Sequence, residues 1–379
     1  MASEFLPIGF KTSAVTAGIK KSGLDLGLML SDRPATAAAV FTANSFPAAP
    51  VIVSRTNLIE SGHKLRAVLV NSGNANACNG EEGLAVARKC AAELAKQLGC
   101  SPCEIFVSST GVIGRPLSAD RICSPLPSLL SGGGNIEEFS RAIMTTDTFP
   151  KVASSEVNGV RILGFAKGSG MIHPNMATML SFVATDAVID YLELDRALRH
   201  VVDRSFNSIT VDGDTSTNDA VAILANGASG ISPKPEAFTA QLMEVCQKLA
   251  KAIARDGEGA SKFVELVIEG APSDDEARII GRAVARSPLV KTAIYGLDSN
   301  WGRLVAAVGN SGVELTSNQI EIYIDDIPMI HGDLAAAQEK MKAKELHIRI
   351  VLHSGSGSAT VWTCDFTEGY IRINADYTT

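Results

Sequence analysis

Hydrophobic residues in the first third of the chain recur in short runs separated by polar and turn-forming residues. The runs RAVLV at residues 66–70 and EIFVSST at 104–110 are rich in β-branched and apolar residues and predict strands. Between them, residues 81–99 are rich in helix formers and end at Gly99, which predicts a helix. This alternation of strand and helix patterns predicts a mixed α/β fold.

The rest of the chain continues the alternation. Residues 157–188 predict a strand, a glycine-containing turn and a second apolar run, and apolar side chains at helical spacing predict helices over 192–202 and 238–253. Near the C-terminus, LHIRIVLH, ATVWTCDF and GYIRINA predict successive strands joined by tight turns. Since we find no repeat and no long linker, the pattern favours a single catalytic unit that extends across the middle of the chain.

Composition narrows the class of partner. Hydrophobic residues make up 46% of the chain and charged residues 20%, which is ordinary for a globular protein. The formal net charge is −7 and no dense run of Lys and Arg occurs, so we expect a small-molecule partner and no nucleic acid. No stretch of about 18 uninterrupted apolar residues occurs, so we expect no membrane-spanning helix.

Cysteine usage and the start of the chain indicate a compartment. The seven cysteines are odd in number and scattered, which is typical of reduced thiols. The start MASEFLPIGFKTS lacks the charged and apolar regions of a secretory signal and is not Arg-rich like a transit peptide. We therefore expect a cytoplasmic protein, or an organellar one if a transit peptide has been removed.

Two motifs suggest ligand chemistry but lack features that it requires. Cys100 and Cys103 have the redox-dithiol spacing, but a predicted helix precedes them and a strand follows, and no second pair completes a zinc site. The acidic stretch 212–219 begins like a calcium loop, but Thr217 stands where a glycine is required and Ile223 where a glutamate is required. We interpret the first as a chance turn and the second as an Asx-rich network that supports a nearby site.

A third motif, Lys167–Gly170, begins like a dinucleotide fingerprint. The third glycine is missing, and His173 and Pro174 occupy the stretch where a helix should start. Histidine is the usual general base, but a lone histidine beside a proline is more often a turn residue. The motifs therefore predict neither a metal nor a nucleotide cofactor.

The most informative stretch is KGSGMIHPNMATML at residues 167–180. Its glycines permit unusual backbone conformations, Pro174 fixes its own φ and restricts His173, and the junction of Ala177 and Thr178 leads into an apolar run. A buried strand that begins with a small hydroxyl residue behind a constrained loop suits an amino-terminal nucleophile. A glycine–proline hairpin that leads into a core strand shows the same pattern, so these residues alone leave both interpretations open.

Over essentially its full length the chain resembles the ornithine acetyltransferase (glutamate N-acetyltransferase) family. The resemblance runs from GFKTSAVTAGIK near the start to the terminal NADYTT, through NSGNANACNG at 71–80, SSTGVIGRPL at 108–117, IMTTDTFPK at 143–151, KGSGMIHPNMATML at 167–180 and DGDTSTNDA at 212–220. It continues with DGEGASK at 256–262, SPLVKTAIYGLDSNWGR at 287–303 and CDFTEGYIRIN at 364–374. Long blocks in the same order make the resemblance specific.

The resemblance implies a fold and a processing step. The implied fold is a layered α/β (α+β) fold of the DmpA/ornithine acetyltransferase type, related to the amino-terminal-nucleophile (Ntn) hydrolases but distinct in connectivity. The implied processing is autocatalytic cleavage between Ala177 and Thr178 into an α chain of residues 1–177 and a β chain of residues 178–379. Together the two chains would form one catalytic unit, and the family implies an α2β2 heterotetramer.

The resemblance also implies site residues. The matching nucleophile is Thr178, and the oxyanion-hole pair falls on Thr110 and Gly111. The substrate-binding positions that carry over are Thr145, Lys167, Thr178, Glu258, Asn374 and Thr379. Thr145 belongs to a short motif that also contains Thr146 and Thr148, so the motif leaves the choice among them open.

These residue types suit acyl transfer. Cleavage frees the α-amine of Thr178, whose reference pKa of about 7.7–8.0 leaves it partly neutral and able to take the proton of its own hydroxyl. Donors at Thr110 and Gly111 would stabilise the developing oxyanion, where the loss of one donor typically costs about 3–4 kcal/mol. Lys167 suits a substrate carboxylate, and Glu258 suits the ornithine ammonium.

The resulting hypothesis is a ping-pong transfer of acetyl from N-acetyl-L-ornithine to L-glutamate in the cyclic arginine biosynthesis pathway, without metal or cofactor. Some family members also take acetyl from acetyl-CoA, so acetyl-CoA is a candidate second acetyl donor. Two alternatives remain open: an Ntn-type aminopeptidase or amidase with water as acceptor, and a non-catalytic amino-acid-binding protein that retains the pocket.

Overall fold

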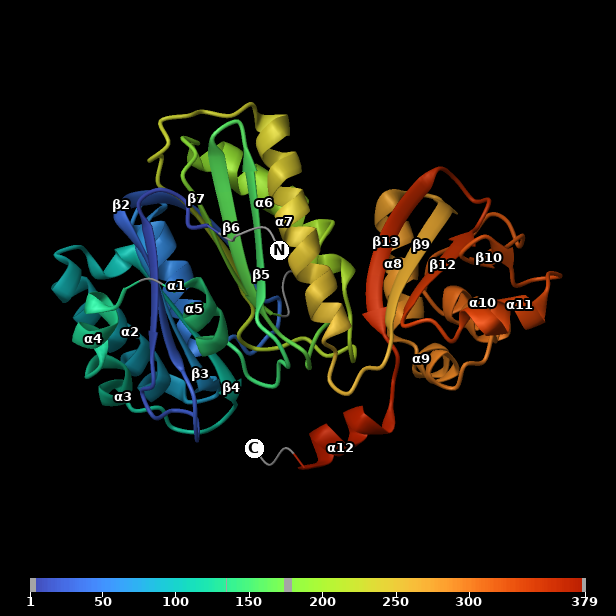
Figure 1. Ribbon diagram of the computed structural model, residues 1–379, viewed down its shortest axis with the longest axis horizontal. Helices are drawn as coiled ribbons and strands as arrows, with labels where there is room; N and C mark the ends of the chain where they lie inside the picture. The colour runs from blue at the N-terminus through green and yellow to red at the C-terminus, as the bar shows by residue number, and fades with distance from the viewer. Residues whose placement is uncertain (1–4, 134, 174–178, 377–379) are drawn as a thin grey trace.

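A computed structural model describes residues 5–133, 135–173 and 179–376 of the chain. Two β-sheets, one of eight strands and one of five, form a larger and a smaller lobe (Figure 1). The strands of the larger sheet are β1 (Phe10–Val15), β2 (Leu26–Phe41), β3 (Lys64–Asn74), β4 (Ile105–Val112), β5 (Lys151–Val157), β6 (Val160–Lys167), β7 (Leu180–Thr185) and β8 (Ala220–Ala225). The helices of this lobe are α1 (Ala49–Glu60), α2 (Gly80–Leu98), α3 (Ala119–Cys123), α4 (Leu126–Ser131), α5 (Ile136–Ala142), α6 (Tyr191–Asp203) and α7 (Pro235–Arg255).

The smaller lobe follows α7 in the chain. Its strands are β9 (Phe263–Ala271), β10 (Glu321–Ile324), β11 (Ile327–Pro328), β12 (Glu345–Val351) and β13 (Gly357–Cys364), in the spatial order β11-β10-β12-β9-β13. Its helices are α8 (Asp274–Arg286), α9 (Pro288–Tyr295), α10 (Trp301–Gly309) and α11 (Leu334–Lys340). The last helix, α12 (Glu368–Asp376), leaves this lobe and lies apart from its sheet (Figure 1).

The larger sheet divides into two facing layers. Strand β2 connects them, because its first half pairs with β3 and its second half with β8. Val68 of β3 and Phe165 of β6 share one core, whereas Ala67 belongs to a core with residues of α1 and α2 and Ile162 to a core with residues of α6 and α7. Alternate residues of one strand thus contact opposite layers. The order helix–strand–strand–helix confirms the layered α/β fold that the resemblance implied.

Strand register brings distant segments to one end of the larger sheet. Lys167, the last residue of β6, lies opposite Leu180 at the start of β7, and Leu180 lies beside Ala220 at the start of the parallel strand β8. The end of β4 lies at Val112, beyond the buried residues Ser109 and Thr110. These strand ends supply the walls of the site described below.

Most of the predicted elements are confirmed, and one is wrong. The strands at 66–70 and 104–110 are β3 and β4, the helix at 81–99 is α2, and the two later helices are α6 and α7. The segments LHIRIVLH and ATVWTCDF form β12 and β13, but GYIRINA forms helix α12.

Apolar and polar residues alternate in GYIRINA as they do in a strand, but this segment belongs to neither sheet. The hydroxyl oxygen of Thr367 accepts a hydrogen bond from the Gly369 amide at 3.0 Å, which supports a turn at the start of α12. The backbone then passes so close to Gly259 that a Cβ on this glycine would lie 2.3 Å from the Tyr370 nitrogen. The contact with the loop after α7 therefore selects the helix.

In the described part of the chain, no helix is both long and apolar enough to cross a membrane.

Replacing Phe182 with alanine should destabilise the larger lobe. Phe182 is fully buried between the two strand layers, with its ring edge-on to Phe106 and Phe139. Truncation leaves a cavity, so we expect the free energy of unfolding to fall by about 3–5 kcal/mol in urea titrations. Phe46→Ala is the matched control, because Phe46 is 74% exposed. A loss below about 1 kcal/mol for Phe182→Ala would contradict this account of the core.

Candidate active site

A cavity of about 300 Å³ lies where β6 ends and β7 and β8 begin, a volume typical of a small-ligand site. The sequence-predicted residues that line it are Thr110, Gly111, Thr145, Lys167, Glu258 and Asn374. They come from β4, the loop after α5, β6, the loop after α7, and α12. The other predicted residues, Ala177, Thr178 and Thr379, lie outside the described residues. Met179 and Leu180, which follow Thr178 in the chain, line the same cavity.

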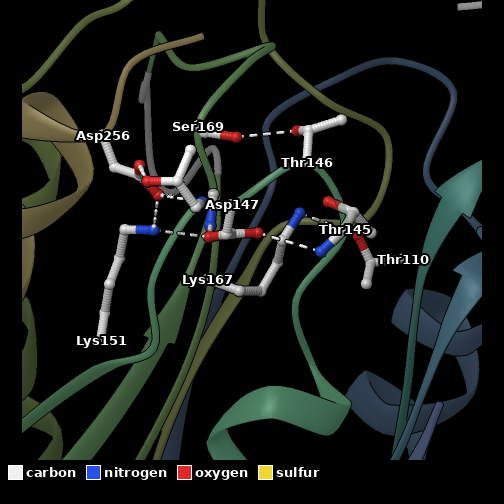
Figure 2. A network of polar contacts seen from close by, with 10 residues as sticks. Thr110, Thr145, Thr146, Asp147, Lys151, Lys167, Ser169 and Asp256 are labelled. Carbon is white, nitrogen blue, oxygen red and sulfur yellow. Dashed lines mark hydrogen bonds and ion pairs between the residues drawn. The ribbon is translucent and has the colours of Figure 1, made fainter. Parts of the chain in front are cut away.

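Thr110 and Lys167 are hydrogen-bonded at the cavity wall (Figure 2). The Nζ of Lys167 donates to the hydroxyl oxygen of Thr110 at 3.1 Å, and both residues are buried. Since the hydroxyl accepts from an ammonium group, its own proton remains available to a second acceptor. The pair can therefore present both a positive charge and a hydroxyl donor to a ligand.

Gly111 is fixed by its approach to β3. Its φ is +126°, and a Cβ at this position would lie 2.5 Å from the carbonyl carbon of Gly73. Any larger residue would collide with the backbone of the neighbouring strand. This steric requirement exists whether or not the Gly111 amide contacts a ligand.

The Glu258 side chain reaches the cavity by packing directly against the backbone of Gly170. A Cβ on Gly170 would lie 2.3 Å from the Glu258 carboxylate, so only glycine admits the side chain in this position. The Glu258 amide donates to the Ser169 carbonyl at 2.9 Å, and the side-chain amide of Asn374 donates to the Glu258 carboxylate, also at 2.9 Å. Helix α12 thus delivers Asn374 to the same group that the resemblance assigns to substrate binding.

Behind the cavity lies a buried cluster of Asp147, Lys151 and Asp256 that the sequence analysis did not identify. The Lys151 ammonium contacts Asp147 at 2.7 Å and Asp256 at 2.5 Å, and the three side chains are at most 2% exposed (Figure 2). A charge in such surroundings must be paired, because the loss of its hydration is not otherwise compensated. We call these residues the acid–lysine cluster.

The acid–lysine cluster holds the segments that line the cavity. The Asp147 carboxylate accepts hydrogen bonds from the Thr145 amide at 3.0 Å and the Gly168 amide at 2.6 Å. The Asp256 carboxylate accepts from the amide of Thr148 at 2.9 Å and from its hydroxyl. The turn at Thr145, the chain after Lys167 and the loop that carries Glu258 are therefore connected through one set of buried charges.

Burial and charge act in opposite directions on these groups. Burial alone would raise the pKa of Asp147, but the ammonium groups of Lys151 and Lys167 and the Gly168 amide outweigh it and lower the pKa to about 2. Burial lowers the pKa of Lys167, and the Asp147 carboxylate opposes part of this effect. Asp147 is thus an anion above about pH 4, where its charge stabilises the ammonium groups of Lys151 and Lys167.

The structure narrows the choice among the three threonines. Thr145 and Thr146 both line the cavity, and the Thr146 hydroxyl is hydrogen-bonded to the Ser169 hydroxyl at 2.7 Å. The Thr148 hydroxyl instead donates to Asp256 in the acid–lysine cluster. Thr148 therefore serves the cluster, and Thr145 remains a candidate together with Thr146.

His173 and the acidic stretch 212–219 have structural contacts. The Nδ1 of His173 lies 3.0 Å from the Thr210 hydroxyl and its Nε2 lies 2.8 Å from the Arg282 guanidinium, while burial lowers its pKa to about 4. The Asp212 carboxylate accepts from the amides of Met171 and Ile172 at 2.6 and 2.9 Å. These contacts agree with the interpretation of 212–219 as a network that supports a site. Its last members, Ser216, Asn218 and Asp219, line the cavity.

The acid–lysine cluster and Asp219 lie inside the motif blocks that carry the family resemblance. Asp147 and Lys151 belong to IMTTDTFPK, Asp256 begins DGEGASK, and Asp219 is near the end of DGDTSTNDA. In each block a charged residue stands beside small and hydroxyl residues, and no helical or strand periodicity places it on the surface. This pattern is the sequence feature that could have indicated a buried charge. Within the described ranges, no group of three or more His, Cys, Asp or Glu side chains is arranged to hold a metal ion.

Comparison with known proteins gives matches along nearly the whole chain. The model of the ArgJ family matches residues 11–379. An arginine biosynthesis bifunctional protein ArgJ from Geobacter sulfurreducens is 48% identical over 391 residues, covering 98% of this chain and 99% of the relative. Another from Thermus thermophilus is 48% identical over 380 residues, covering 99% of each. A crystal structure of the protein of this name from Bacillus halodurans is 44% identical with a TM-score of 0.50, covering 53% of this chain and 100% of that chain.

The acid–lysine cluster predicts a specific loss of stability in acid. The folded-state pKa of Asp147 is about 2, below the value of about 3.9 for an unfolded chain. Its contribution is therefore complete above about pH 4 and is lost as the pH falls toward 2, an effect on the order of 2 kcal/mol. Denaturant titrations between pH 6 and 2 should show a steeper decline for the wild type than for Asp147→Asn. Parallel curves for the two proteins would contradict the assignment.

Proposed function

Since the chain belongs to the ArgJ family, whose relatives are named bifunctional proteins of arginine biosynthesis, we propose that it transfers acetyl from N-acetyl-L-ornithine to L-glutamate. The acetyl group would be carried by Thr178 in a ping-pong reaction, after self-cleavage between Ala177 and Thr178. The observation that carries the proposal is the convergence on one cavity of Thr110, Lys167 and Glu258, which are far apart in the sequence.

The chemistry begins with the nucleophile. In the uncut chain the nitrogen of Thr178 is an amide, which cannot accept a proton, whereas cleavage would turn it into an amine. The amine can then take the proton of the threonine hydroxyl as this hydroxyl attacks the acetyl carbon, directly or through one water. Met179 and Leu180 line the cavity, so the chain enters β7 beside the proposed substrate site.

Thr110 suits the stabilisation of the developing oxyanion. Its hydroxyl accepts from Lys167 at 3.1 Å, so the hydroxyl proton can be donated to the oxyanion, and the nearby ammonium adds a favourable field. Gly111 follows Thr110 and lines the same wall, where its amide would be the second donor. In this cavity the same donors would serve self-cleavage and turnover.

The charges of the cavity suit an amino acid with a carboxylate and a side-chain cation. An ammonium has three N–H donors, so Lys167 can bind the substrate carboxylate while it donates to Thr110. Glu258, held by Asn374 at 2.9 Å, would bind the ornithine ammonium. Thr145 or Thr146 and the terminal Thr379 would complete the substrate contacts.

Acetyl-CoA is proposed only as an additional acetyl donor, and no cofactor or metal is required by the mechanism. The two chains would assemble as an α2β2 heterotetramer in the cytoplasm. Native mass spectrometry would test the assembly, and incubation with acetyl-CoA and glutamate alone would test the second donor.

The variant Thr178→Ala should remain a single chain of 39.8 kDa and form no acetylglutamate, because it lacks the hydroxyl that both reactions need. Wild type should show a second amino terminus reading Thr-Met-Leu-Ser. Thr178→Ser keeps a hydroxyl and is the matched control that should still be cleaved. Two bands from Thr178→Ala on a denaturing gel would exclude Thr178 as the nucleophile for cleavage.

Acetyl transfer itself is tested by incubating wild type with N-acetyl-L-ornithine, with and without L-glutamate. Acetylglutamate formed together with ornithine supports the transferase. Release of free acetate at the same rate in both mixtures would support the amidase alternative.

Thr110→Val should lower kcat by about 10²–10³ with little change in KM, because the variant keeps the shape of the side chain but loses the oxyanion donor. Thr110→Ser keeps the hydroxyl and should retain most of the activity in the same steady-state assay. Gly111→Ala is a poor test, since its Cβ would collide with Gly73. An unchanged kcat for Thr110→Val would remove Thr110 from the oxyanion site.

A further inference from the structure

Asp219 is a buried carboxyl group in the cavity wall that the proposed function does not use. It is 3% exposed and lines the cavity together with Thr110, Lys167 and Glu258. Two backbone hydrogen bonds fix its position. The Asp219 carbonyl accepts from the Thr42 amide at 2.9 Å, and the amide of the following residue, Ala220, donates to the Met179 carbonyl at 3.0 Å. Asp219 therefore lies beside the first described residue of the segment that leads into β7.

One oxygen of this carboxyl group lacks a partner. Ser216 lies close enough to lower the pKa of the carboxyl group through hydrogen bonding, but no described residue bonds Oδ2, although this atom is buried. A buried polar atom without a partner is unfavourable, so native proteins rarely keep one unless a ligand or water uses it. Because the residue lines the cavity, a bound substrate is the natural partner of Oδ2.

The surroundings of Asp219 favour the protonated carboxyl. Burial raises its pKa well above the usual range, while hydrogen bonds from Ser216 and the charge of Lys167 act in the opposite direction. Asp147 shows the contrast, since it has a lysine in direct contact and its pKa is lowered to about 2. A protonated Asp219 has an O–H to donate where Asp147 has only acceptors.

We propose that Asp219 is the general acid that protonates the amine leaving the acetyl donor, a role that rests on the proposed function. In the first half-reaction the amide C–N bond breaks, its electron pair stays on nitrogen, and nitrogen takes the proton from the Asp219 carboxyl. The acetyl carbon remains bonded to the threonine oxygen, and Asp219 is left as a carboxylate. In the second half-reaction it takes a proton from the attacking amine of the acceptor, which restores the acid.

Other titratable groups near the cavity are engaged elsewhere. Lys167 donates to Thr110, and Glu258 accepts from Asn374. The ring of His173 has both nitrogens in contact with Thr210 and Arg282, and His173 does not line the cavity. Among the described residues, Asp219 alone lines the cavity, carries a buried oxygen without a hydrogen-bond partner and has a pKa raised by burial.

The test compares two acetyl donors whose leaving groups differ in their need for a proton. N-Acetyl-L-ornithine releases an amine that must be protonated, whereas p-nitrophenyl acetate releases a stable phenolate. Asp219→Asn keeps the shape but cannot supply the proton, so kcat with acetylornithine should fall about 100-fold, at nearly unchanged KM. The rate with p-nitrophenyl acetate should change less than about threefold, which a merely structural role would not predict.

Ser181→Ala is the matched control. Ser181 lies in β7, is fully buried and also carries an oxygen without a partner among the described residues, but it does not line the cavity. This variant should keep wild-type rates with both donors. Equal losses with both donors in Asp219→Asn, or no loss with either, would overturn the role of Asp219.

A second measurement uses the unaltered enzyme and decides the proposal even if Asp219→Asn prevents self-cleavage. Acetylation from acetylornithine should decline at alkaline pH as Asp219 loses its proton, while acetylation from p-nitrophenyl acetate should not. The charged group that acts directly on the pKa of Asp219 is Lys167. The pKa of Lys167 is in turn affected by the charges of Asp147, Lys151 and Glu258, the last of which also lines the cavity. Because these groups and the threonine amine are common to both reactions, only the difference between the two profiles reports Asp219.

The two proposals fail differently. If wild-type protein forms no acetyl-enzyme from either donor, the proposed function fails. If wild type is active but both donors give the same alkaline profile, only the role of Asp219 is overturned.

Discussion

The Lys151 ammonium lies between two carboxylates in a part of the protein from which water is excluded. Removing Lys151 would leave two buried carboxylates without the cation that they share, so the lysine holds the three side chains together. Lys151 and Asp256 are separated by 105 residues, and their contact therefore fixes distant segments of the chain. The Asp147 carboxylate accepts from the amides of Thr145 and Gly168, and the Asp256 carboxylate accepts from the Thr148 amide. The cluster therefore ties together segments that line the cavity.

Asp147 and Asp219 both lie within reach of the Lys167 charge, yet the pKa of Asp147 is lowered and that of Asp219 is raised. Asp147 meets the Lys151 ammonium and two backbone amides, so its carboxylate form is stabilised despite complete burial. Asp219 is equally hidden but has only Ser216 as a described hydrogen-bond donor, so burial dominates and its protonated form is favoured. Near one cavity, the carboxyl group with several close donors therefore has a lowered pKa, and the one with fewer described donors has a raised pKa.

Two glycines shape the site because they carry no side chain. Gly170 leaves room for the Glu258 carboxylate, and Gly111 lets β4 approach β3 where the wall of the cavity turns. Helix α12 then returns from the smaller lobe and places Asn374 against Glu258. The smaller lobe thus completes a cavity whose other walls belong to the larger one.

The sequence by itself determined the elements whose pattern is local and the residues that belong to long, specific motif blocks. Strands β3 and β4 and helix α2 follow from hydrophobic periodicity, and Thr110, Lys167 and Glu258 follow from the family resemblance. Only the tertiary structure decided the rest, because the causes are contacts between distant segments. The segment GYIRINA becomes a helix through its contact with the loop at Gly259, and Asp147, Lys151 and Asp256 become a cluster only when the chain buries them together. The raised pKa of Asp219 likewise depends on burial and on the scarcity of nearby donors, which residue type and spacing do not encode.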